Sequence, residues 1–420
     1  MAVNVNKKRI PFFYRNILIM FKGTLIAQII AILGAIFLAK LYGEEAYGIF
    51  GVFISITSIS SIISTLQLDN CIIISKDKIE SVNWFNFLLL LVFVLISFAC
   101  VVFFFSSFFI TYKQEEINMI YFVVPGTLIL SYNLLNVNLF TFNKEFTVIS
   151  SSKIFLAIGT VFLQFILYKK FNLFGLIIGF LISQFLVLFF LFLKNKKNII
   201  KPNFIKIKRD VKANSSIIKF LLPSNIINSF ANNLMPILIL AVFGAKEAGV
   251  YFFSFKILGA PLFLISSSVS QVFFQKASEL FKTNKSELHR LTKKIVTTNL
   301  LLIFGFLVCI NTIGMYVLEL YFNNGWENLR LYVFILSMLI FARTSFNPIS
   351  SLIIVLNKNQ ISLLFNVYLF AVNLIAIYIG YFYNTIIYTI LTLAIFGGTG
   401  YLFLLLYFLN YLKKTASYNE

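Results

Sequence analysis

The chain has 420 residues, of which 60% are hydrophobic and only 12% are charged. An average soluble protein carries about 25% charged residues, so the composition excludes a water-soluble globular fold. A nucleic-acid-binding protein could share the formal net charge of +20, but the mean hydropathy of +0.91 excludes that class. Apolar runs such as 84–105 lack the alternation of a transmembrane β-barrel. We therefore expect an all-α polytopic membrane protein.

About 20 consecutive apolar residues cross a bilayer as a helix, and the sequence predicts about twelve such segments. The expected spans are 16–39, 48–68, 84–105, 117–142, 147–168, 172–193, 217–243, 250–273, 293–317, 329–356, 361–382 and 385–412. The divisions at Asn143–Phe146 and at Asn384 depend on the greatest length that a bilayer permits, because the connections there are very short. The long first segment, without a small-residue cleavage site, predicts an uncleaved helix rather than a signal peptide.

Lysine and arginine are distributed unevenly between alternate loops. If the N-terminus lies in the cytoplasm, the cytoplasmic loops and termini hold 24 of them and the opposite loops hold six. Cytoplasmic loops of membrane proteins carry an excess of these residues. The count predicts that both termini are cytoplasmic, and this topology explains most of the positive charge.

The longest connection, 194–216, is basic and divides six expected helices from six. An internal repeat supports this division, because Tyr42–Phe50 reads YGEEAYGIF and Phe243–Tyr251 reads FGAKEAGVY, at a constant offset of 201. Both copies lie between the first and second helix of their half. Parallel repeats of this kind occur in several transporter folds. We expect an N-lobe over 1–200 and a C-lobe over 201–420 around a central cavity.

Five cations lie inside the expected spans, where charged side chains are rare and usually functional. Lys22, Lys153 and Lys219 are within two turns of a cytoplasmic end, so each could reach the headgroups with its side chain. Arg343 is a dozen residues from either end of its span, and Lys256 is about two turns from the outer end. We predict that Arg343 and Lys256, with Lys22 and Lys153 as further candidates, face an aqueous cavity and bind substrate.

Of the fifteen acidic residues, only Asp69 is close to a predicted span. A pump that works through buried carboxylates would carry them within its helices. Cations without carboxylates favour an anionic ligand and disfavour coupling through a carboxylate cation site, although backbone and asparagine oxygens could still hold Na⁺.

Uncharged polar residues form stripes on several expected helices and predict a polar cavity lining. The predicted lining residues are Asn225, Asn228, Asn232, Asn347, Asn133, Asn136, Ser266, Gln271 and Asp69. Pro223 and Pro236 bracket the asparagine face of the seventh helix and are expected to kink or unwind it. Such residues also join helices by hydrogen bonds without any role in substrate binding, so each stripe has two interpretations.

Other features predict no chemistry. The three cysteines are scattered and the single histidine, His289, lies among charges in an expected loop, so no metal site is predicted. No phosphate-binding loop, nucleophile motif or paired carboxylates occur in the sequence, so no cofactor and no catalytic residue are expected. The 52 phenylalanines are interpreted as lipid-facing bulk, with no aromatic cage implied.

Five segments form a recognisable pattern: LYGEEAYG over 41–48, LPSN over 222–225, GAKEAGVY over 244–251, KILGAP over 256–261 and SQVFF over 270–274. These segments resemble bacterial polysaccharide-biosynthesis flippases, which translocate O-antigen and capsule repeat units. Those flippases belong to the multidrug/oligosaccharidyl-lipid/polysaccharide exporter superfamily. The resemblance in length and hydropathy covers nearly the whole chain.

This resemblance implies two six-helix bundles across a V-shaped cavity in the bacterial cytoplasmic (inner) membrane. It also implies a non-enzymatic transporter that moves an undecaprenyl-pyrophosphate-linked oligosaccharide from the cytoplasmic to the periplasmic leaflet by alternating access. The pyrophosphate would contact the cavity cations, and the sugars would contact the asparagine and serine faces. A polymerase and a chain-length regulator are possible partners.

Three other functions are compatible with a membrane protein of this length. A multidrug exporter of the same superfamily would share the fold, but its cavity should carry acids for cationic drugs. An integral-membrane glycan polymerase would usually have a large periplasmic loop, whereas the outer loops here are short. A lipid-linked peptidoglycan precursor flippase typically has two helices more than the twelve expected.

Overall fold

The structure is a computed structural model and describes residues 12–106, 114–213, 222–323, 325–356 and 358–417. Within these ranges every regular element is a helix. Ten stretches are long and apolar enough to cross a membrane, which confirms the expected all-α polytopic class. Two of them, Lys22–Thr65 and Phe146–Asn198, are 44 and 53 residues long and each contains a break. The count of twelve spans stays a prediction.

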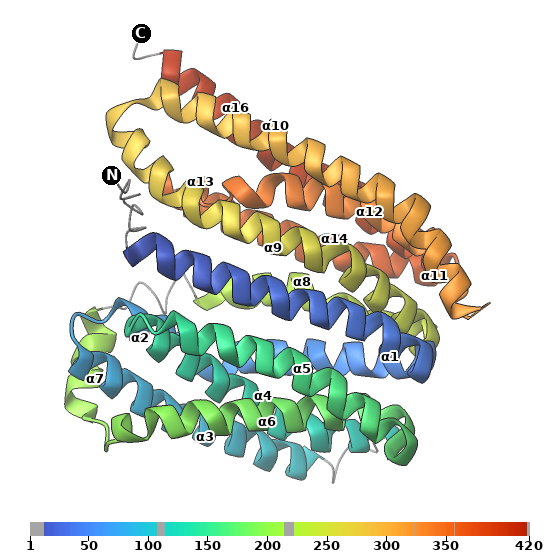
Figure 1. The fold of residues 1–420 in the computed structure, drawn as a ribbon, viewed down its shortest axis with the longest axis horizontal. Helices are drawn as coiled ribbons and strands as arrows, with labels where there is room; N and C mark the ends of the chain where they lie inside the picture. The colour runs from blue at the N-terminus through green and yellow to red at the C-terminus, as the bar shows by residue number, and fades with distance from the viewer. Residues whose placement is uncertain (1–11, 107–113, 214–221, 324, 357, 418–420) are drawn as a thin grey trace, which may run out of the picture.

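Figure 1 shows the helices in two groups, which we call the N-bundle and the C-bundle. The N-bundle comprises α1 (Phe12–Thr65), α2 (Asn70–Ile74), α3 (Lys78–Ser106), α4 (Gln114–Phe142), α5 (Phe146–Phe171), η1 (Asn172–Phe174), α6 (Gly175–Asn195), η2 (Lys196–Asn198) and α7 (Phe204–Ala213). The C-bundle comprises α8 (Leu222–Phe243), α9 (Ala245–Thr283), α10 (Lys285–Cys309), η4 (Ile310–Gly314), α11 (Met315–Phe322), α12 (Leu329–Phe346), η5 (Asn347–Ile349), α13 (Leu352–Val355), α14 (Asn359–Phe382), α15 (Ile386–Thr392), η6 (Leu393–Gly397) and α16 (Gly398–Ser417).

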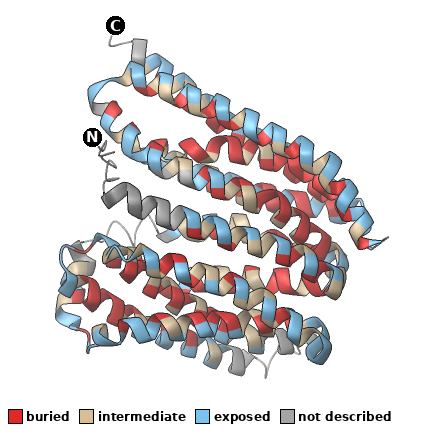
Figure 2. Cartoon of the chain, in the orientation of Figure 1, coloured by how far each residue is buried: buried red, intermediate tan, exposed pale blue. Residues whose placement is uncertain are grey.

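The long helices are apolar on most sides, and their outward faces remain uncovered. Figure 2 shows buried residues where helices meet and exposed residues along the outer surfaces. Phe98, Leu301 and Phe403 are among the many large apolar side chains on such surfaces. A soluble monomer rarely exposes apolar patches of this extent, whereas a membrane protein places them against lipid.

Several helix boundaries differ from the sequence expectation. The loop expected over 40–47 is shorter than predicted: α1 consists of two helices that meet at a sharp kink, and only Gly43 has non-helical backbone there. The tenth span was expected to reach residue 356, but α12 ends at Phe346, since Pro348 cannot continue its hydrogen bonding. Of the two expected effects of Pro236, unwinding does not occur, because α8 remains helical through this residue, and a kink stays a prediction. The short helices α2 and α7 lie in segments that we expected to be loops.

The internal repeat appears in the backbone conformation. Gly43 (φ 77°, ψ −179°) and Gly244 (φ 91°, ψ 177°) share a region of backbone space that is essentially restricted to glycine. The two copies also meet each other: a Cβ atom added to Gly48 would overlap the carbonyl oxygen of Ala245, and one added to Gly249 would overlap that of Glu44. The residue pairs in the two contacts correspond to each other through the repeat offset of 201. The two copies therefore pack against each other reciprocally.

The two ends of the bundles carry different features. Helix α1 begins and α16 ends at the same end, where α7 also lies (Figure 1). We call it the linker end, and we call the opposite end, with Gly43 and Gly244, the glycine end. The sequence predicts that the linker end is cytoplasmic. Helix α7 packs on α3 of the N-bundle, although the division at residue 200 assigned it to the C-lobe; that division stays a proposal.

Candidate substrate cavity

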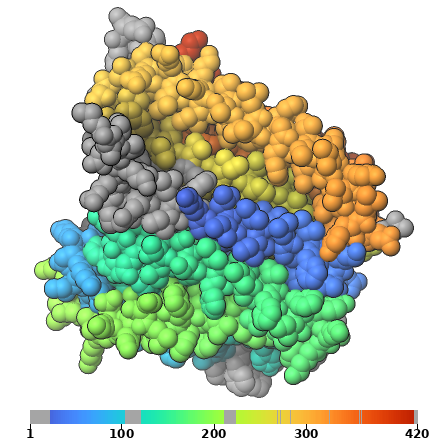
Figure 3. Space-filling view, viewed as in Figure 1, coloured from blue at the N-terminus to red at the C-terminus, as the bar shows by residue number. Residues whose placement is uncertain are grey.

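A cavity of about 630 Å³ lies between the two bundles. Its described lining residues are Thr24, Ala27, Gln28, Ala31, Ala35, Leu38, Tyr47, Phe50, Ile54, Lys153, Leu156, Ala157, Thr160, Val161, Gln164, Phe180, Phe252, Phe255, Lys256, Ala260 and Phe263. On the face drawn in Figure 3, α1 lies between the rest of the N-bundle and the C-bundle. The cavity therefore lies where the two bundles meet.

The two walls of the cavity differ in chemistry. On α5, Lys153, Thr160 and Gln164 recur at helical spacing and, with Thr24 and Gln28 of α1, form a polar strip, which we call the polar wall, within a mainly apolar N-bundle lining. Gln164 is buried, and its Nε2 donates to the carbonyl oxygen of Leu176 in α6 at 2.7 Å. The facing wall, on α9, consists mainly of aromatic side chains: Phe252, Phe255 and Phe263 lie on one face together with Lys256. Hydrogen-bonding groups and aromatic rings thus face the same space.

Two of the cations predicted from sequence, Lys153 and Lys256, line this cavity. Arg343 is not among the described lining residues, but it packs against two of the lining rings. Lys153 Nζ donates a hydrogen bond to Thr24 Oγ1 at 3.2 Å. Lys256 Nζ is 6.0 Å from the centre of the Phe252 ring. Arg343 Cζ, reaching from α12, is 4.7 Å from the centre of the Phe263 ring and 5.8 Å from that of Phe255. The described lining residues include no carboxylate, so aromatic faces and a hydroxyl are the observed partners of the three cations.

The fourth predicted cation, Lys22, is exposed on α1 and is not among the lining residues. Lys219 lies outside the described residues. The phenylalanines were expected to be mainly lipid-facing bulk and interface anchors, but five of them, Phe50, Phe180, Phe252, Phe255 and Phe263, line the cavity. Many others do face outward, as Phe403 does.

The polar residues predicted on the N-bundle join helices to one another. Asn133 Nδ2 donates to Gln184 Oε1 (2.8 Å), and Asn195 Nδ2 donates to Asn136 Oδ1 (2.7 Å), so both asparagines tie α4 to α6. Asp69 is buried at the end of α1, where Thr65 and Asn138 donate to its carboxylate at 3.2 and 3.0 Å. Burial raises the pKa of Asp69, and these hydrogen bonds partly oppose the rise. These residues are not among the described lining of the cavity.

The polar residues predicted on the C-bundle are likewise outside the described lining. Asn232 Nδ2 donates to the side chain of Asn228, both on α8, at 2.7 Å. Ser266 is buried on α9, and Asn347 lies half-buried in η5, where α12 ends. The side chain of Gln271 lies outside the described residues.

Sequence reasoning missed most of the polar wall, including Gln28, Thr160 and Gln164. Each is an isolated polar residue in an apolar helix, without the repeated asparagines that drew attention to α8. The sequence did contain one indication of these residues, namely their helical spacing from Thr24 and Lys153. The lysine, threonine and glutamine on one face of α5 could have identified the polar wall.

Aromatic packing and ion pairs close the cavity at the glycine end. The Trp326 side chain, 6% exposed, lies between Tyr47 and Phe253, with ring centres 5.6 and 4.5 Å away. Its Nε1 donates to the carbonyl oxygen of Ala39 across the bundles at 3.3 Å. Outside this cluster, Lys246 Nζ is 2.7 Å from Glu327 Oε2 and 3.7 Å from Glu44 Oε2.

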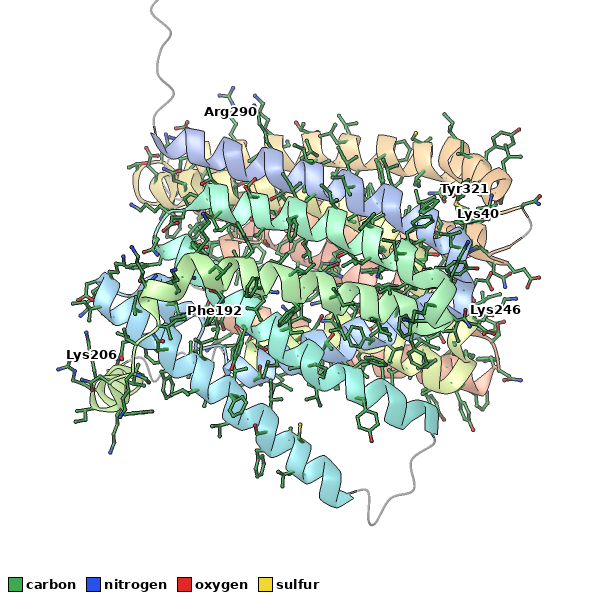
Figure 4. The ribbon with its side chains drawn as sticks, turned by 60° about the horizontal axis from the view of Figure 1, so that its bottom comes forward. Lys40, Phe192, Lys206, Lys246, Arg290 and Tyr321 are labelled. Carbon is green, nitrogen blue, oxygen red and sulfur yellow. The ribbon has the colours of Figure 1, made fainter. Side chains whose placement is uncertain are left out.

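Further charged contacts surround this closure. Lys246 donates a hydrogen bond to Glu327 and so holds the pKa of that carboxyl below its ordinary value. Lys40 Nζ, from the N-bundle, is 4.4 Å from the centre of the Tyr321 ring of the C-bundle. Figure 4 shows Lys40, Tyr321 and Lys246 at the same end of the molecule.

The linker end has a simpler contact between the bundles. Asn225 Nδ2 of α8 donates to Gln67 Oε1 at 3.0 Å, and both side chains are half-buried. Among the described residues, the aromatic and charged contacts between the bundles therefore lie at the glycine end, and an amide hydrogen bond lies at the linker end.

Solved structures of membrane transporters share this arrangement of helices. A structure of the lipid II flippase MurJ in an inward closed conformation aligns with a TM-score of 0.70 and 16% identity, over 93% of this chain and 87% of that one. An inward-facing multidrug resistance transporter of the MATE family, from the MOP superfamily, aligns with a TM-score of 0.66 and 13% identity, over 95% and 99% of the two chains. A MOP superfamily transporter from Pyrococcus furiosus gives 0.60 and 12%, over 95% and 96%. The fold is thus that of MOP superfamily transporters.

The family follows from the sequence itself. Residues 37–330 match the model of the family described as polysaccharide biosynthesis protein, and the chain belongs to this family. The resemblance inferred from the repeated glycine segments is thereby confirmed. Comparison with curated proteins gives no match.

Proposed function

We propose that this protein is a flippase for an undecaprenyl-pyrophosphate-linked oligosaccharide repeat unit. It would carry the unit from the cytoplasmic to the periplasmic leaflet of the bacterial inner membrane, for O-antigen or capsular polysaccharide assembly. One observation carries the proposal: Lys153 and Lys256 line a cavity between the bundles whose described lining contains no carboxylate, and Arg343 packs against two of its rings.

A charged side chain at membrane depth is costly unless it is paired. A pyrophosphate group brings the anionic oxygens that Lys153 and Lys256 lack here, and charge-assisted hydrogen bonds to such oxygens are among the stronger ones in proteins. Arg343, held against two of the lining rings, adds positive potential on the same side. The cavity is therefore complementary to the charged part of a lipid-linked sugar.

The other parts of the substrate fit the two walls. In this proposal the hydroxyl groups of the sugars bond to Gln28 and Thr160, in place of the asparagine faces expected from sequence. The aromatic wall offers flat apolar faces to the sugar rings. The polyprenyl tail stays in the bilayer at the gap between the bundles, and a polymerase and a chain-length regulator would act on the product.

Substrate movement requires the two ends to open alternately. The closure at the glycine end and the simple amide contact at the linker end favour loading from the linker end, which is the predicted cytoplasmic side. Rocking of the bundles would then exchange the two arrangements, as in other transporters built from repeats.

A multidrug exporter of the same superfamily is the second candidate, because the fold is equally that of MATE transporters. A cationic drug would meet the positive charges of Lys153 and Lys256 without an opposing carboxylate among the described lining residues. Electrostatics therefore favour the anionic substrate.

The test is deletion of the gene in its native host, followed by analysis of the surface-glycan acceptor and the lipid-linked intermediates by mass spectrometry. The proposal expects acceptors without any repeat unit and lipid-linked single repeats inside the cell. Acceptors that carry one repeat each, but never a chain, would show intact translocation and favour a polymerase. Increased drug sensitivity with normal glycan would favour the exporter.

Complementation of the deletion tests the cavity. We expect the double variant Lys256→Met/Arg343→Met to restore little glycan, whereas Lys256→Arg, which keeps the charge, restores more than Lys256→Met. Lys22→Met is the matched control, since Lys22 is exposed outside the lining. Normal glycan from the double variant at wild-type protein levels would overturn the charge assignment.

A further inference from the structure

The basic connection between the bundles is attached to the N-bundle through its backbone. Asn83 Oδ1 accepts from the N–H of Asn203 at 2.6 Å, and Asn83 Nδ2 donates to the carbonyl of the same residue at 3.4 Å. Asn86, one turn further along α3, accepts from the N–H of Ile200 at 3.1 Å and donates to the carbonyl of Asn198 at 2.8 Å. Since each amide uses both of its polar atoms, the connection is held in one position.

Helix α7 within this connection has one face on the protein and one face away from it. Ile207 is 3% exposed and packs in the core formed with α3, and the Phe204 ring lies 6.2 Å from that of Phe87. On the opposite side Ile205 is 84% exposed. At 100° per residue, Lys208 and Arg209 flank Ile205 on the helix surface, and both are exposed.

The position of α7 places this outer face at the membrane boundary. In Figures 1 and 4, α7 runs across the direction of the long helices, at the end where α3 begins and α6 ends. The spans that contain these two helices begin at Lys78 and end at Asn198. A helix in this place lies along the membrane surface, at the level of the lipid headgroups.

The charge of the connection suits one kind of partner. Residues 194–213 contain eight lysines and arginines and one acid, Asp210. Arg209 Nε is 3.9 Å from Asp210 Oδ1, and the side chains of Lys201 and Lys208 are exposed. Ile199 and Ile200, 40% and 51% exposed, continue the apolar surface. Exposed apolar side chains bordered by cations are typical of helices that lie in an anionic membrane interface.

We propose that the outer face of α7 binds anionic phospholipid headgroups, with Ile205 inserted between them and Lys201, Lys208 and Arg209 on the phosphates. This contact fixes the N-bundle at one depth of the predicted cytoplasmic leaflet, because Asn83 and Asn86 tie the connection to α3. It is independent of the substrate that the cavity carries.

The test places a reporter at Ile205 in the full chain. The cysteines at positions 71, 100 and 309 are replaced by serine, Ile205→Cys is labelled with an environment-sensitive fluorophore, and the protein is reconstituted in nanodiscs. The discs contain phosphatidylcholine alone or with about 30% phosphatidylglycerol. Nitroxide-labelled lipids should quench the fluorophore, whereas iodide in the water should not. The emission maximum should lie further to the blue in the discs with phosphatidylglycerol than in those with phosphatidylcholine alone. The matched control is Arg290→Cys, an exposed position at the same end (Figure 4), where iodide should quench.

A charge variant tests the headgroup part separately. In Lys201→Gln/Lys208→Gln/Arg209→Gln we expect the enrichment of phosphatidylglycerol over phosphatidylcholine among retained lipids to fall about fivefold per cation removed. Lys169→Gln/Lys170→Gln, two exposed cations of α5 at the glycine end, should leave the enrichment unchanged. Quenching of the Ile205 reporter by iodide alone would overturn the proposal and would instead favour a soluble acidic partner for the outer face of α7. Unchanged enrichment in the triple variant would also overturn it.

Discussion

The glycine end and the linker end of the cavity are joined across the bundles by contacts of different kinds. At the glycine end, Trp326 packs against Tyr47, Gly48 and Gly249 bring backbones together, and Lys246 bridges two carboxylates. At the linker end, Asn225 and Gln67 join the bundles by an amide–amide hydrogen bond.

The difference has a physical consequence for transport. Aromatic burial and close backbone packing are strong and need matching surfaces, so they separate only when a whole bundle moves. A single hydrogen bond contributes about 1 kcal/mol and can break under thermal motion. Variants at the two ends should therefore have unequal effects.

The largest effect is expected from Trp326→Ala. Loss of a buried tryptophan costs about 3–5 kcal/mol, and here it also removes the aromatic cluster between the bundles. Thermal unfolding of the purified protein in detergent measures the loss. Phe403→Ala, which truncates an outward-facing ring of α16, should change the unfolding midpoint little. Equal midpoints for the two variants would contradict the importance of the cluster.

Gly249→Ala should have the next largest effect. The added methyl group would overlap the carbonyl oxygen of Glu44, and overpacking of this kind costs about 1–3 kcal/mol. Gly48→Ala should behave alike, because the repeat makes the contact reciprocal. As a control, Gly305→Ala meets no atom within 4 Å and should be neutral or slightly stabilising, since alanine favours a helix. If Gly249→Ala is as stable as this control, the bundles do not meet at Gly249.

Asn225→Ala tests the linker end and should cost about 1 kcal/mol. A cysteine at the cavity-lining position Ala31, in a background without other cysteines, should then react faster with a thiol reagent added from the linker end. Asn228→Ala, on the same helix, removes a hydrogen-bond acceptor only within α8 and should not change the rate. Equal rates in the two variants would show that the amide contact does not restrict access.

The smallest effect concerns the exposed ion pair of Lys246 and Glu327. Because the Glu327 pKa is lowered from its ordinary value of 4.5, the pair contributes fully above that value, and its contribution is lost as pH falls through the lowered pKa. Only the thiolate reacts, so the rate of the same Ala31→Cys reporter is divided at each pH by the rate of this thiol in the unfolded protein. This ratio, for reagent added from the glycine end, should rise about two- to fivefold on acidification. Lys246→Met should remove this dependence, whereas Lys169→Met should keep it. A pH profile shared by both variants would exclude the ion pair.

The residues predicted from sequence for the site fall into two groups, those that could be placed from sequence and those that could not. Lys153, Lys256 and Arg343 could be identified from sequence because a charge inside an apolar span needs a polar environment wherever the helix is placed. Asn133 and Asn136 could not be placed, since an amide in a membrane helix is satisfied equally by a neighbouring helix or by a cavity. Here Gln184 and Asn195 are their partners. Phe252 and Phe263 gave no signal, because aromatic rings suit lipid and cavity alike.

The sequence by itself determined the membrane class, most of the helical segments, the glycine repeat and the sign of the cavity charge. These follow from composition and from residues whose requirements are local, such as the backbone of Gly43 and Gly244. Only the tertiary structure decided which helix faces line the cavity and which end is closed. The physical reason is that lipid and helix interfaces are both apolar, so hydropathy does not distinguish a side chain that faces lipid from one that faces the other bundle.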